Sequence, residues 1–327
     1  MKRALYSQRG PVPQDVIDAV DFELPSPLAT GQALVEVLAA PINPSDVLTL
    51  TGQYGLLPPL PAVGGNEGVG RVVELGPDTR GPQPGQTVLL PVGSGTWCTH
   101  LVVDAARLMP LPKGDAQQLS MMTVNPPTAL LMLRSFVDLQ PGEWVIQNAA
   151  NSGVGAYLIQ LAALRGLKTV NIVRREAAVE GVRGLGGDVV LVDGDKLAKR
   201  VAEATGGAKI RLGIDAVGGD ATDHLAHCLT EGAVLVNYGA MSGEPCHVSP
   251  GAFVFRDITL RGFWLSRWFK QASMEERTQV FGEVAALIAQ GKLHARVQAT
   301  YPLERIREAV AAAAAGERDG KILVVPA

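Results

Sequence analysis

The chain contains 327 residues, of which 47% are apolar and 19% charged, and its formal net charge is −3 with an isoelectric point near 6.0. This weakly acidic balance gives no electrostatic basis for binding a nucleic acid or an anionic membrane, and no apolar run approaches the ~18 residues of a membrane-spanning helix. The cysteines, Cys98, Cys228 and Cys246, are far apart, which is typical of reduced thiols. We therefore expect a soluble cytoplasmic protein, and the length predicts two domains.

Residues 1 to about 120 combine frequent proline and glycine with short β-branched runs. This composition predicts a compact, mostly antiparallel β-barrel. Its strands are expected at 32–38, 70–74, 87–90 and 100–103. The pattern becomes helical near Asp115, which can cap a helix, and a second helical run is expected from 128 to 133.

From 143 to about 289, strands and helices alternate, which is the pattern of a doubly wound parallel α/β fold. The expected strands lie at 143–147, 168–173, 188–192, 210–216, 232–237 and 258–263. Beyond 290 we expect a strand, a helix over 303–314 and a last strand over 322–325. The sequence thus predicts an α/β protein with a mostly-β barrel domain (1–122) and a Rossmann domain (123–289), after which 290–327 returns to the barrel domain.

The central motif runs from Trp144 to Gly155 and reads WVIQNAANSGVG. It predicts a buried strand and a tight turn, and the apolar-periodic stretch from Tyr157 to Leu164 predicts the helix that follows. Dinucleotide-binding folds place a pyrophosphate at such a turn, because glycine lets the backbone approach the phosphates and the N–H groups of the first helical turn point toward them. Ala150 stands where the first glycine of the usual G-x-G-x-x-G would lie.

The cofactor preference is indicated at the end of the next predicted strand, 168–173. Roughly 20 residues past the glycines, an NAD-binding chain would carry an acidic residue for the ribose hydroxyls. This chain carries Arg174 and Arg175 instead. Guanidinium groups cannot accept hydrogen bonds from a ribose diol, but they bind a 2′-phosphate through charged, forked hydrogen bonds. The pair predicts NADPH, the alternative being two solvated charges on a loop.

A barrel-like domain joined to a dinucleotide fold resembles the medium-chain dehydrogenase/reductase superfamily. Its zinc-dependent alcohol dehydrogenases bind their catalytic metal with a Cys shortly before a Thr-Asp or Ser-Asp and with a Gly-His-Glu. The matching segments here are Asn43-Pro44-Ser45-Asp46 and Gly65-Asn66-Glu67. The thiolate is absent and an amide replaces the imidazole, so we expect no metal site and a structural, hydrogen-bonding role for Glu67.

The chain is more similar to the zinc-free, mitochondrial-type trans-2-enoyl-thioester reductases. The segments that carry the resemblance are 40–46, 52–58, 61–69, 95–97, 124–126, 146–155 and 260–266. The resemblance implies a GroES-like barrel domain and NADPH-dependent reduction of the C2=C3 double bond of trans-2-enoyl thioesters, as in fatty acid biosynthesis. The acyl group would be carried by coenzyme A or a carrier protein. It also implies a homodimer that pairs edge strands, here 258–263.

The same resemblance implies the site residues. The family's active-site tyrosine falls on Tyr54, although a tyrosine in such a loop can also be a packing residue with its hydroxyl in water. The family's NADPH contacts fall on Asn125, Asn151, Ser152, Gly153, Val154, Gly155, Arg174, Arg175, Tyr238, Gly239, Ala240, Met241, Phe263, Trp264, Leu265, Ser266 and Lys321. Lys321 could instead be an edge-strand charge, and Phe263 and Trp264 could be core residues.

Two other functions are compatible with the sequence. One is a zinc-independent NADPH quinone or enone oxidoreductase, which needs a smaller and flatter pocket; the other is an NADPH-binding protein without turnover. A thioester acyl chain needs an apolar tunnel, and its candidate lining residues are Met121, Met122, Leu130, Leu131 and Met132, although core packing is their default role. The three-apart pair His224 and His227 is interpreted as incidental.

Overall fold

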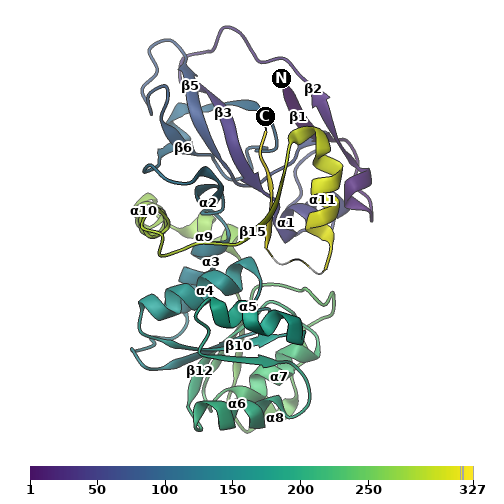
Figure 1. Cartoon of the computed structure of the whole chain (residues 1–327), viewed down its shortest axis with the longest axis vertical. Coiled ribbons are helices and arrows are strands. Elements are labelled where there is room, and N and C mark those ends of the chain that lie inside the picture. The colour runs from purple at the N-terminus through teal and green to yellow at the C-terminus, as the bar shows by residue number, and fades with distance from the viewer. Residues whose placement is uncertain (317, 319, 327) are drawn as a thin grey trace. The chain divides into compact units, whose positions relative to one another are not determined.

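The computed structural model describes residues 1–316, 318 and 320–326, and the chain divides into two compact units (Figure 1). The first contains residues 1–124 together with the chain from Phe281 onward, and the second contains Asn125–Val280. The second boundary falls inside one long helix, α10 (Met274–Ala289). Among the described residues, no helix combines the length and the apolar character needed to cross a membrane.

The first unit is built mainly from short strands. Its elements are β1 (Lys2–Tyr6), a 3-10 turn (Pro13–Asp15), β2 (Ile17–Asp21), β3 (Gln32–Pro41), α1 (Pro44–Thr51), β4 (Ala62–Val63), β5 (Val69–Leu75), β6 (Thr87–Leu89), β7 (His100–Asp104), a 3-10 turn (Ala105–Arg107), β8 (Met109–Pro110), α2 (Ala116–Ser120), β15 (Val297–Tyr301), a 3-10 turn (Leu303–Arg305), α11 (Ile306–Ala314) and β16 (Lys321–Val324). Asp115 caps α2 through its side chain, as predicted.

Two sheets organise these strands. One has the order β2-β1-β4, and the other runs β15-β16-β3-β5-β6-β8 with β7 also paired to β3. Along β3, alternate residues such as Ala33, Val35 and Val37 are buried, because successive side chains of a strand point to opposite faces. They pack in one core with residues of α11, among them Ile306 and Val310. The return of the C-terminal segment to this unit places β16 beside β3.

The second unit alternates strands and helices. Its elements are α3 (Asn125–Ser135), β9 (Trp144–Gln147), α4 (Gly153–Leu164), β10 (Lys168–Val173), a 3-10 turn (Glu176–Ala178), α5 (Val179–Gly184), β11 (Val189–Val192), α6 (Leu197–Thr205), β12 (Ile210–Asp215), α7 (Asp220–Cys228), β13 (Val234–Asn237), α8 (Pro250–Val254), β14 (Thr259–Gly262) and α9 (Leu265–Gln271). All six predicted strands are present, most of them one or two residues shorter than expected.

The six strands form one parallel sheet in the order β11-β10-β9-β12-β13-β14. Helices cover both faces, with α4 and α5 on one side and α6, α7 and α8 on the other (Figure 1). The order reverses at β9, and ligands of such sheets bind beyond the carboxyl ends of the strands at this reversal. The doubly wound fold is confirmed, and it brings the glycine turn after β9 to the place where a dinucleotide is expected.

Candidate functional site

The turn between β9 and α4 has the predicted strand–turn–helix geometry. Ala149 adopts a φ of 47°, which is uncommon for a residue with a side chain, and its carbonyl accepts a hydrogen bond from the Ser152 N–H at 2.8 Å. Ser152 caps α4, because its hydroxyl oxygen accepts a hydrogen bond from the Gly155 N–H at 3.1 Å. The first N–H groups of a helix lack intrahelical partners, so this helix end is suited to a phosphate group.

Gly155 is required by the packing of the protein itself. A Cβ at this residue would lie 2.6 Å from the carbonyl oxygen of Ala150 and 2.8 Å from that of Ala149. The absence of a side chain therefore lets α4 approach the preceding turn, which is the role of the third glycine in dinucleotide-binding motifs. The carbonyl of Gly155 also accepts a hydrogen bond from Gln147 Nε2 at 3.1 Å, which ties α4 to β9.

Two predicted cofactor segments meet at Ser152. The Tyr238 side chain, which follows β13, is hydrogen-bonded to the Ser152 side chain. Desolvation raises the pKa of Tyr238 well above its usual range, and the bond to Ser152 opposes that shift only in part. The phenol is therefore neutral at physiological pH. Behind it, a Cβ at Gly239 would lie 2.7 Å from the carbonyl oxygen of Ala216, so this loop too follows the strand ends closely.

A buried carboxylate, Asp215 at the end of β12, organises the strand ends, although it was not among the predicted site residues. One oxygen accepts hydrogen bonds from Asn148 Nδ2 at 2.6 Å and from two backbone N–H groups. The other accepts from Thr222 Oγ1 at 2.7 Å and Asn237 Nδ2 at 2.9 Å. Its five hydrogen bonds join the ends of β9, β12 and β13 to α7. The signal in the sequence is a polar residue at the end of each of three apolar strands, namely Asn148, Asp215 and Asn237.

The other predicted cofactor residues of this unit lie at or near strand ends. Arg174 is exposed and Arg175 partly buried, directly after β10. Phe263 follows β14 and packs edge-on against Phe136, with ring centroids 6.3 Å apart. Of the rest, Asn151, Ala240 and Met241 are exposed, Gly153, Trp264 and Ser266 are partly buried, and Asn125, Val154 and Leu265 are buried. Their contacts with NADPH stay a prediction.

Tyr54 lies in the first unit, directly after α1. The helix ends at Gly52, whose φ of 81° lets the chain turn back, and the carbonyl of Leu48 accepts hydrogen bonds from the N–H groups of Gln53 at 2.9 Å and Tyr54 at 3.2 Å. The Tyr54 side chain is partly buried. Its backbone position is therefore fixed by the end of α1.

The loop that follows Tyr54 presents apolar side chains. Leu56, Leu57 and Leu60 are 54%, 39% and 38% exposed. The loop is held by Arg9, whose guanidinium donates a hydrogen bond to the carbonyl of Pro58. In contrast, Met121, Met122, Leu130, Leu131 and Met132 are all 5% exposed or less. The leucines of the Tyr54 loop are therefore exposed, whereas the five candidate tunnel residues are buried.

A buried polar cluster lies at the other end of α1. Asn43 is the N-cap residue, and its backbone N–H donates to Asp46 Oδ2 at 2.7 Å in a capping box. Its side-chain amide donates to Glu67 Oε1 at 2.6 Å and accepts a hydrogen bond from Lys321 Nζ at 2.5 Å. Asn66 Nδ2 donates to Asp46 Oδ1 at 2.7 Å. Sequence reasoning found Lys321 and Glu67, but it did not place them together.

Burial is the largest influence on the pKa values of the ionisable groups in this cluster. Desolvation raises the pKa of Asp46 to about 7 and that of Glu67 above its usual range, and it lowers the pKa of Lys321 to about 8. The opposite charge of Lys321 opposes the shift of each carboxyl. Glu67 Oε2 also accepts hydrogen bonds from the N–H groups of Thr123 at 3.0 Å and Val124 at 2.9 Å, so its expected structural role is supported by geometry. Lys321 is not an edge charge, because β16 lies between β15 and β3.

This cluster does not fit a zinc ion. Its donors are two carboxylates and two amides, without the thiolates and imidazoles that zinc prefers, and an ammonium group lies among them. No group of three or more His, Cys, Asp or Glu residues suited to a metal occurs in the part of the chain that the structure describes.

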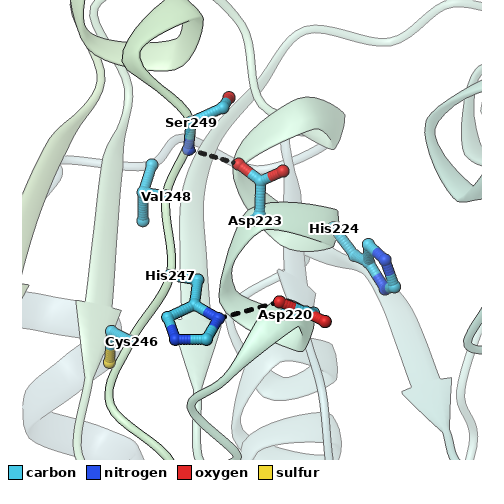
Figure 2. Close-up of a pocket in the computed structure, with 7 residues that line it drawn as sticks. All are labelled: Asp220, Asp223, His224, Cys246, His247, Val248 and Ser249. Atoms are coloured by element: carbon cyan, nitrogen blue, oxygen red, sulfur yellow. Dashed lines mark hydrogen bonds and ion pairs between the residues drawn. The ribbon is translucent and has the colours of Figure 1, made fainter.

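A separate pocket lies beside α7 in the second unit and is lined by Asp220, Asp223, His224, Cys246, His247, Val248 and Ser249. Figure 2 shows the His247 ring directed at Asp220, to which its Nδ1 is bonded at 2.8 Å, and the Ser249 N–H directed at Asp223. His224 and His227 pair with different carboxyl groups, those of Asp193 and Asp223, so the two imidazoles do not form a joint site. This lining is mainly polar and does not suit an acyl chain.

Comparisons with known proteins agree with this geometry. Residues 29–113 match the alcohol dehydrogenase GroES-like domain, and residues 153–283 match the domain described as zinc-binding dehydrogenase. Together with the doubly wound sheet, these matches define a medium-chain dehydrogenase/reductase, here with a cluster unsuited to zinc. The mitochondrial enoyl-[acyl-carrier-protein] reductase of Rattus norvegicus is 39% identical over 319 residues, covering 95% of this chain and 85% of that protein. The chain belongs to the enoyl thioester reductase family.

Two solved structures show the same fold over nearly the whole chain. The complex of Etr1p with NADP and crotonyl-CoA superposes with a TM-score of 0.91 at 27% identity, covering 99% of both chains. A putative NADPH:quinone reductase from Bacillus thuringiensis gives 0.90 at 26% identity, covering 100% of this chain and 99% of that one. The fold therefore does not separate an enoyl reductase from a quinone reductase, whereas sequence similarity to the relatives does.

The expectation of a cytoplasmic protein is wrong by the same comparisons. Relatives from rat, mouse, human and Arabidopsis thaliana, 37–39% identical to this chain, are all named as mitochondrial enzymes. Net charge, unpaired cysteines and the lack of a long apolar run describe any reducing aqueous compartment. These properties do not distinguish the cytoplasm from the interior of a mitochondrion.

Proposed function

We propose that this protein reduces the C2=C3 double bond of trans-2-enoyl thioesters with NADPH as cofactor. The observation that carries the proposal is membership in the enoyl thioester reductase family, with 39% identity over 95% of the chain. The capped N-terminus of α4 receives the pyrophosphate, and Arg174 and Arg175 at the end of β10 receive the 2′-phosphate. Lys321 is a further proposed contact of the cofactor.

Held at this site, NADPH would supply the hydride for the β-carbon of the substrate, and a proton from the Tyr54 phenol or from water would be added to the α-carbon. Negative charge builds up on the thioester oxygen as the hydride arrives, so a hydrogen-bond donor is needed there. Tyr54 has this role: its phenol donates to the developing enolate, from a backbone position fixed by the end of α1. Leu56, Leu57 and Leu60 offer apolar surface for the acyl chain.

The proposal is tested by the rate of NADPH oxidation with a medium-chain trans-2-enoyl-CoA. Tyr54→Phe removes the donor, and we expect kcat to fall by roughly 10²-fold or more, since positioned donors and acids contribute on that order. Tyr301→Phe is the matched control, because it removes a hydroxyl from another partly buried tyrosine of the same unit. Equal activity of wild type and Tyr54→Phe would refute the role of Tyr54.

The alternative function is a quinone or enone oxidoreductase, favoured by the close superposition on the Bacillus thuringiensis protein. The same assay with a simple quinone separates the two. Quinone turnover that exceeds enoyl turnover, and that does not change in Tyr54→Phe, would assign the protein to the quinone reductases.

A homodimer through β14 is also part of the proposal. β14 is the last strand in the sheet order, and among the described residues no further strand pairs with its outer edge. The neighbouring Phe253, Val254 and Phe255, in and just after α8, are 43%, 71% and 82% exposed, which is unusual for contiguous apolar side chains. Light scattering should give the mass of a dimer for wild type and for the control Met274→Asp. Phe255→Asp should give a monomer, and a monomeric wild type would contradict the proposal.

A further inference from the structure

Apart from the proposed contact of Lys321 with the cofactor, the buried cluster at the start of α1 has no assigned role, yet it contains three ionisable groups. Lys321 is 6% exposed, Asp46 3% and Glu67 is fully buried. Buried charges are costly unless they are paired and hydrogen-bonded, and removal of one partner leaves the other uncompensated. An arrangement of this kind, joining residues 278 positions apart in the sequence, calls for a physical explanation.

Asn43 joins the two charges through one oriented amide. Its Oδ1 accepts from the ammonium of Lys321, and its Nδ2 donates to the carboxylate of Glu67. This orientation is dictated by the two partners, because an ammonium can only donate and an ionised carboxylate can only accept. Asn43 is also the N-cap of α1, so the charges fix the residue from which the helix begins.

The helix carries this constraint to the reaction site. α1 is eight residues long, and its Val47 and Leu50 pack in the core of the first unit. The carbonyl of Leu48, in the last turn, holds the backbone N–H of Tyr54. A rotation or displacement of the N-cap would therefore move the tyrosine, because a short, packed helix moves as one body.

We propose that Lys321, Asn43 and Glu67 form a buried relay that positions Tyr54 through α1. The proposal rests on the proposed function of Tyr54. None of the three residues is required to touch the enolate; Asn43 and Glu67 are positioning residues. Asp46 and Arg318 are the other charged groups that act on Lys321, and Asp46 completes the capping box.

The test moves the negative charge from residue 67 to residue 43. In Asn43→Asp, two carboxylates face each other. In Glu67→Gln, one amide replaces a carboxylate that accepts hydrogen bonds from Asn43 and from the N–H groups of Thr123 and Val124. We expect each single variant to lower kcat by about tenfold or more, since small misplacements in an active site have effects of that size or larger.

The double variant, Asn43→Asp with Glu67→Gln, restores a complementary set of donors and acceptors. The new amide at position 67 donates to the new carboxylate at position 43 and accepts from the two backbone N–H groups. The carboxylate at position 43 in turn accepts from Lys321. We expect kcat of the double variant to return to within about threefold of wild type.

Tyr54→Phe is then introduced into each background. A positioning role requires that this change lower kcat by a much smaller factor in the single variants than in wild type or the double variant. The reason is that a misplaced hydroxyl already contributes little to kcat, so its removal has a smaller effect. Glu74→Gln, an exposed carboxyl of the same unit, is the control and should behave as wild type. An equal Tyr54→Phe factor in all backgrounds would show that the cluster is merely structural and would overturn the proposal.

Unfolding midpoints are measured for the same set. If the single variants are too unstable for their activity to be compared, a double variant with the unfolding midpoint of wild type and the same decrease in kcat on Tyr54→Phe supports the relay. A double variant whose loss of kcat equals the product of the losses in the two single variants overturns it. If Tyr54→Phe leaves the activity of the wild type unchanged, the proposed role of Tyr54 fails and its positioning fails with it. A restored midpoint in the double variant would then identify a relay that serves stability alone.

Discussion

Substitution of Gly155 by alanine tests whether close packing of α4 on its own turn sets the geometry of the cofactor site. The added Cβ would lie 2.6 Å from the carbonyl oxygen of Ala150 and 2.8 Å from that of Ala149, whereas ordinary contacts begin at 3.4 Å. The atoms that it meets belong to the backbone and cannot rotate away. Relief of the closest contact requires α4 and the turn to separate by about 0.8 Å, the difference between those distances.

Such overpacking costs roughly 1–3 kcal/mol of unfolding free energy, and the better helix propensity of alanine offsets at most about 1 kcal/mol of it. The matched control is Gly181→Ala in α5 of the same unit, where nothing lies within 4 Å of the added Cβ and φ is not positive. This control should gain about 0.5–1 kcal/mol.

Urea unfolding and NADPH titration by fluorescence measure the two consequences. We expect Gly155→Ala to unfold at lower urea than wild type, Gly181→Ala at higher urea, and only Gly155→Ala to bind NADPH about tenfold or more weakly. Wild-type stability and affinity in Gly155→Ala would refute the reasoning, because they would mean that the turn has room for a side chain.

Three further outcomes are expected. Replacing both Arg174 and Arg175 by alanine should raise the Kd for NADPH by roughly 10- to 100-fold, from the loss of charged hydrogen bonds, while the Kd for NADH, measured in the same titration, stays nearly constant. Asp215→Ala should lower the unfolding free energy by about 3–5 kcal/mol because five donors, three in buried and two in part-buried hydrogen bonds, lose their acceptor, whereas exposed Asp220→Ala should have little effect in the same urea experiment. Burial raises the folded-state pKa of Asp46 to about 7, so the contribution of Asp46 to stability is fully present below about pH 4 and is lost as the pH rises through 7. Between these pH values the unfolding free energy of wild type should decrease more steeply than that of Asp46→Asn. Equal slopes would contradict this prediction.

Local patterns in the sequence were sufficient for the elements of the second unit and for its motif. Burial on both faces makes the strands of a parallel sheet short apolar runs, so β9, β10 and β12 could be located from composition alone. Likewise the prediction of Asp115 as a helix cap depends on a local hydrogen bond, which joins residues two positions apart.

Resemblance to a family added the reaction and the individual site residues, whereas NADPH was already predicted from the glycine turn and the arginine pair. The resemblance could not reveal how individual residues are used. Gly155 was expected to make room for a phosphate, but in the structure it also makes room for the carbonyl groups of Ala149 and Ala150. The prediction of a cytoplasmic location was wrong, because overall composition reflects solvation and redox conditions and does not identify the compartment.

The sequence by itself determined the features that depend on residues close together in the chain. These are the alternation of strands and helices, the glycine turn, the arginine pair after β10 and the absence of zinc ligands in the matching segments. Only the tertiary structure decided that Lys321 meets Asn43 across 278 positions, that Glu67 holds the N–H groups of Thr123 and Val124, and that Asp215 joins three strand ends. The physical reason is that repeating patterns of two or 3.6 residues report which face of an element is buried. A hydrogen bond between buried polar groups depends instead on which distant segments the fold brings within about 3 Å of each other.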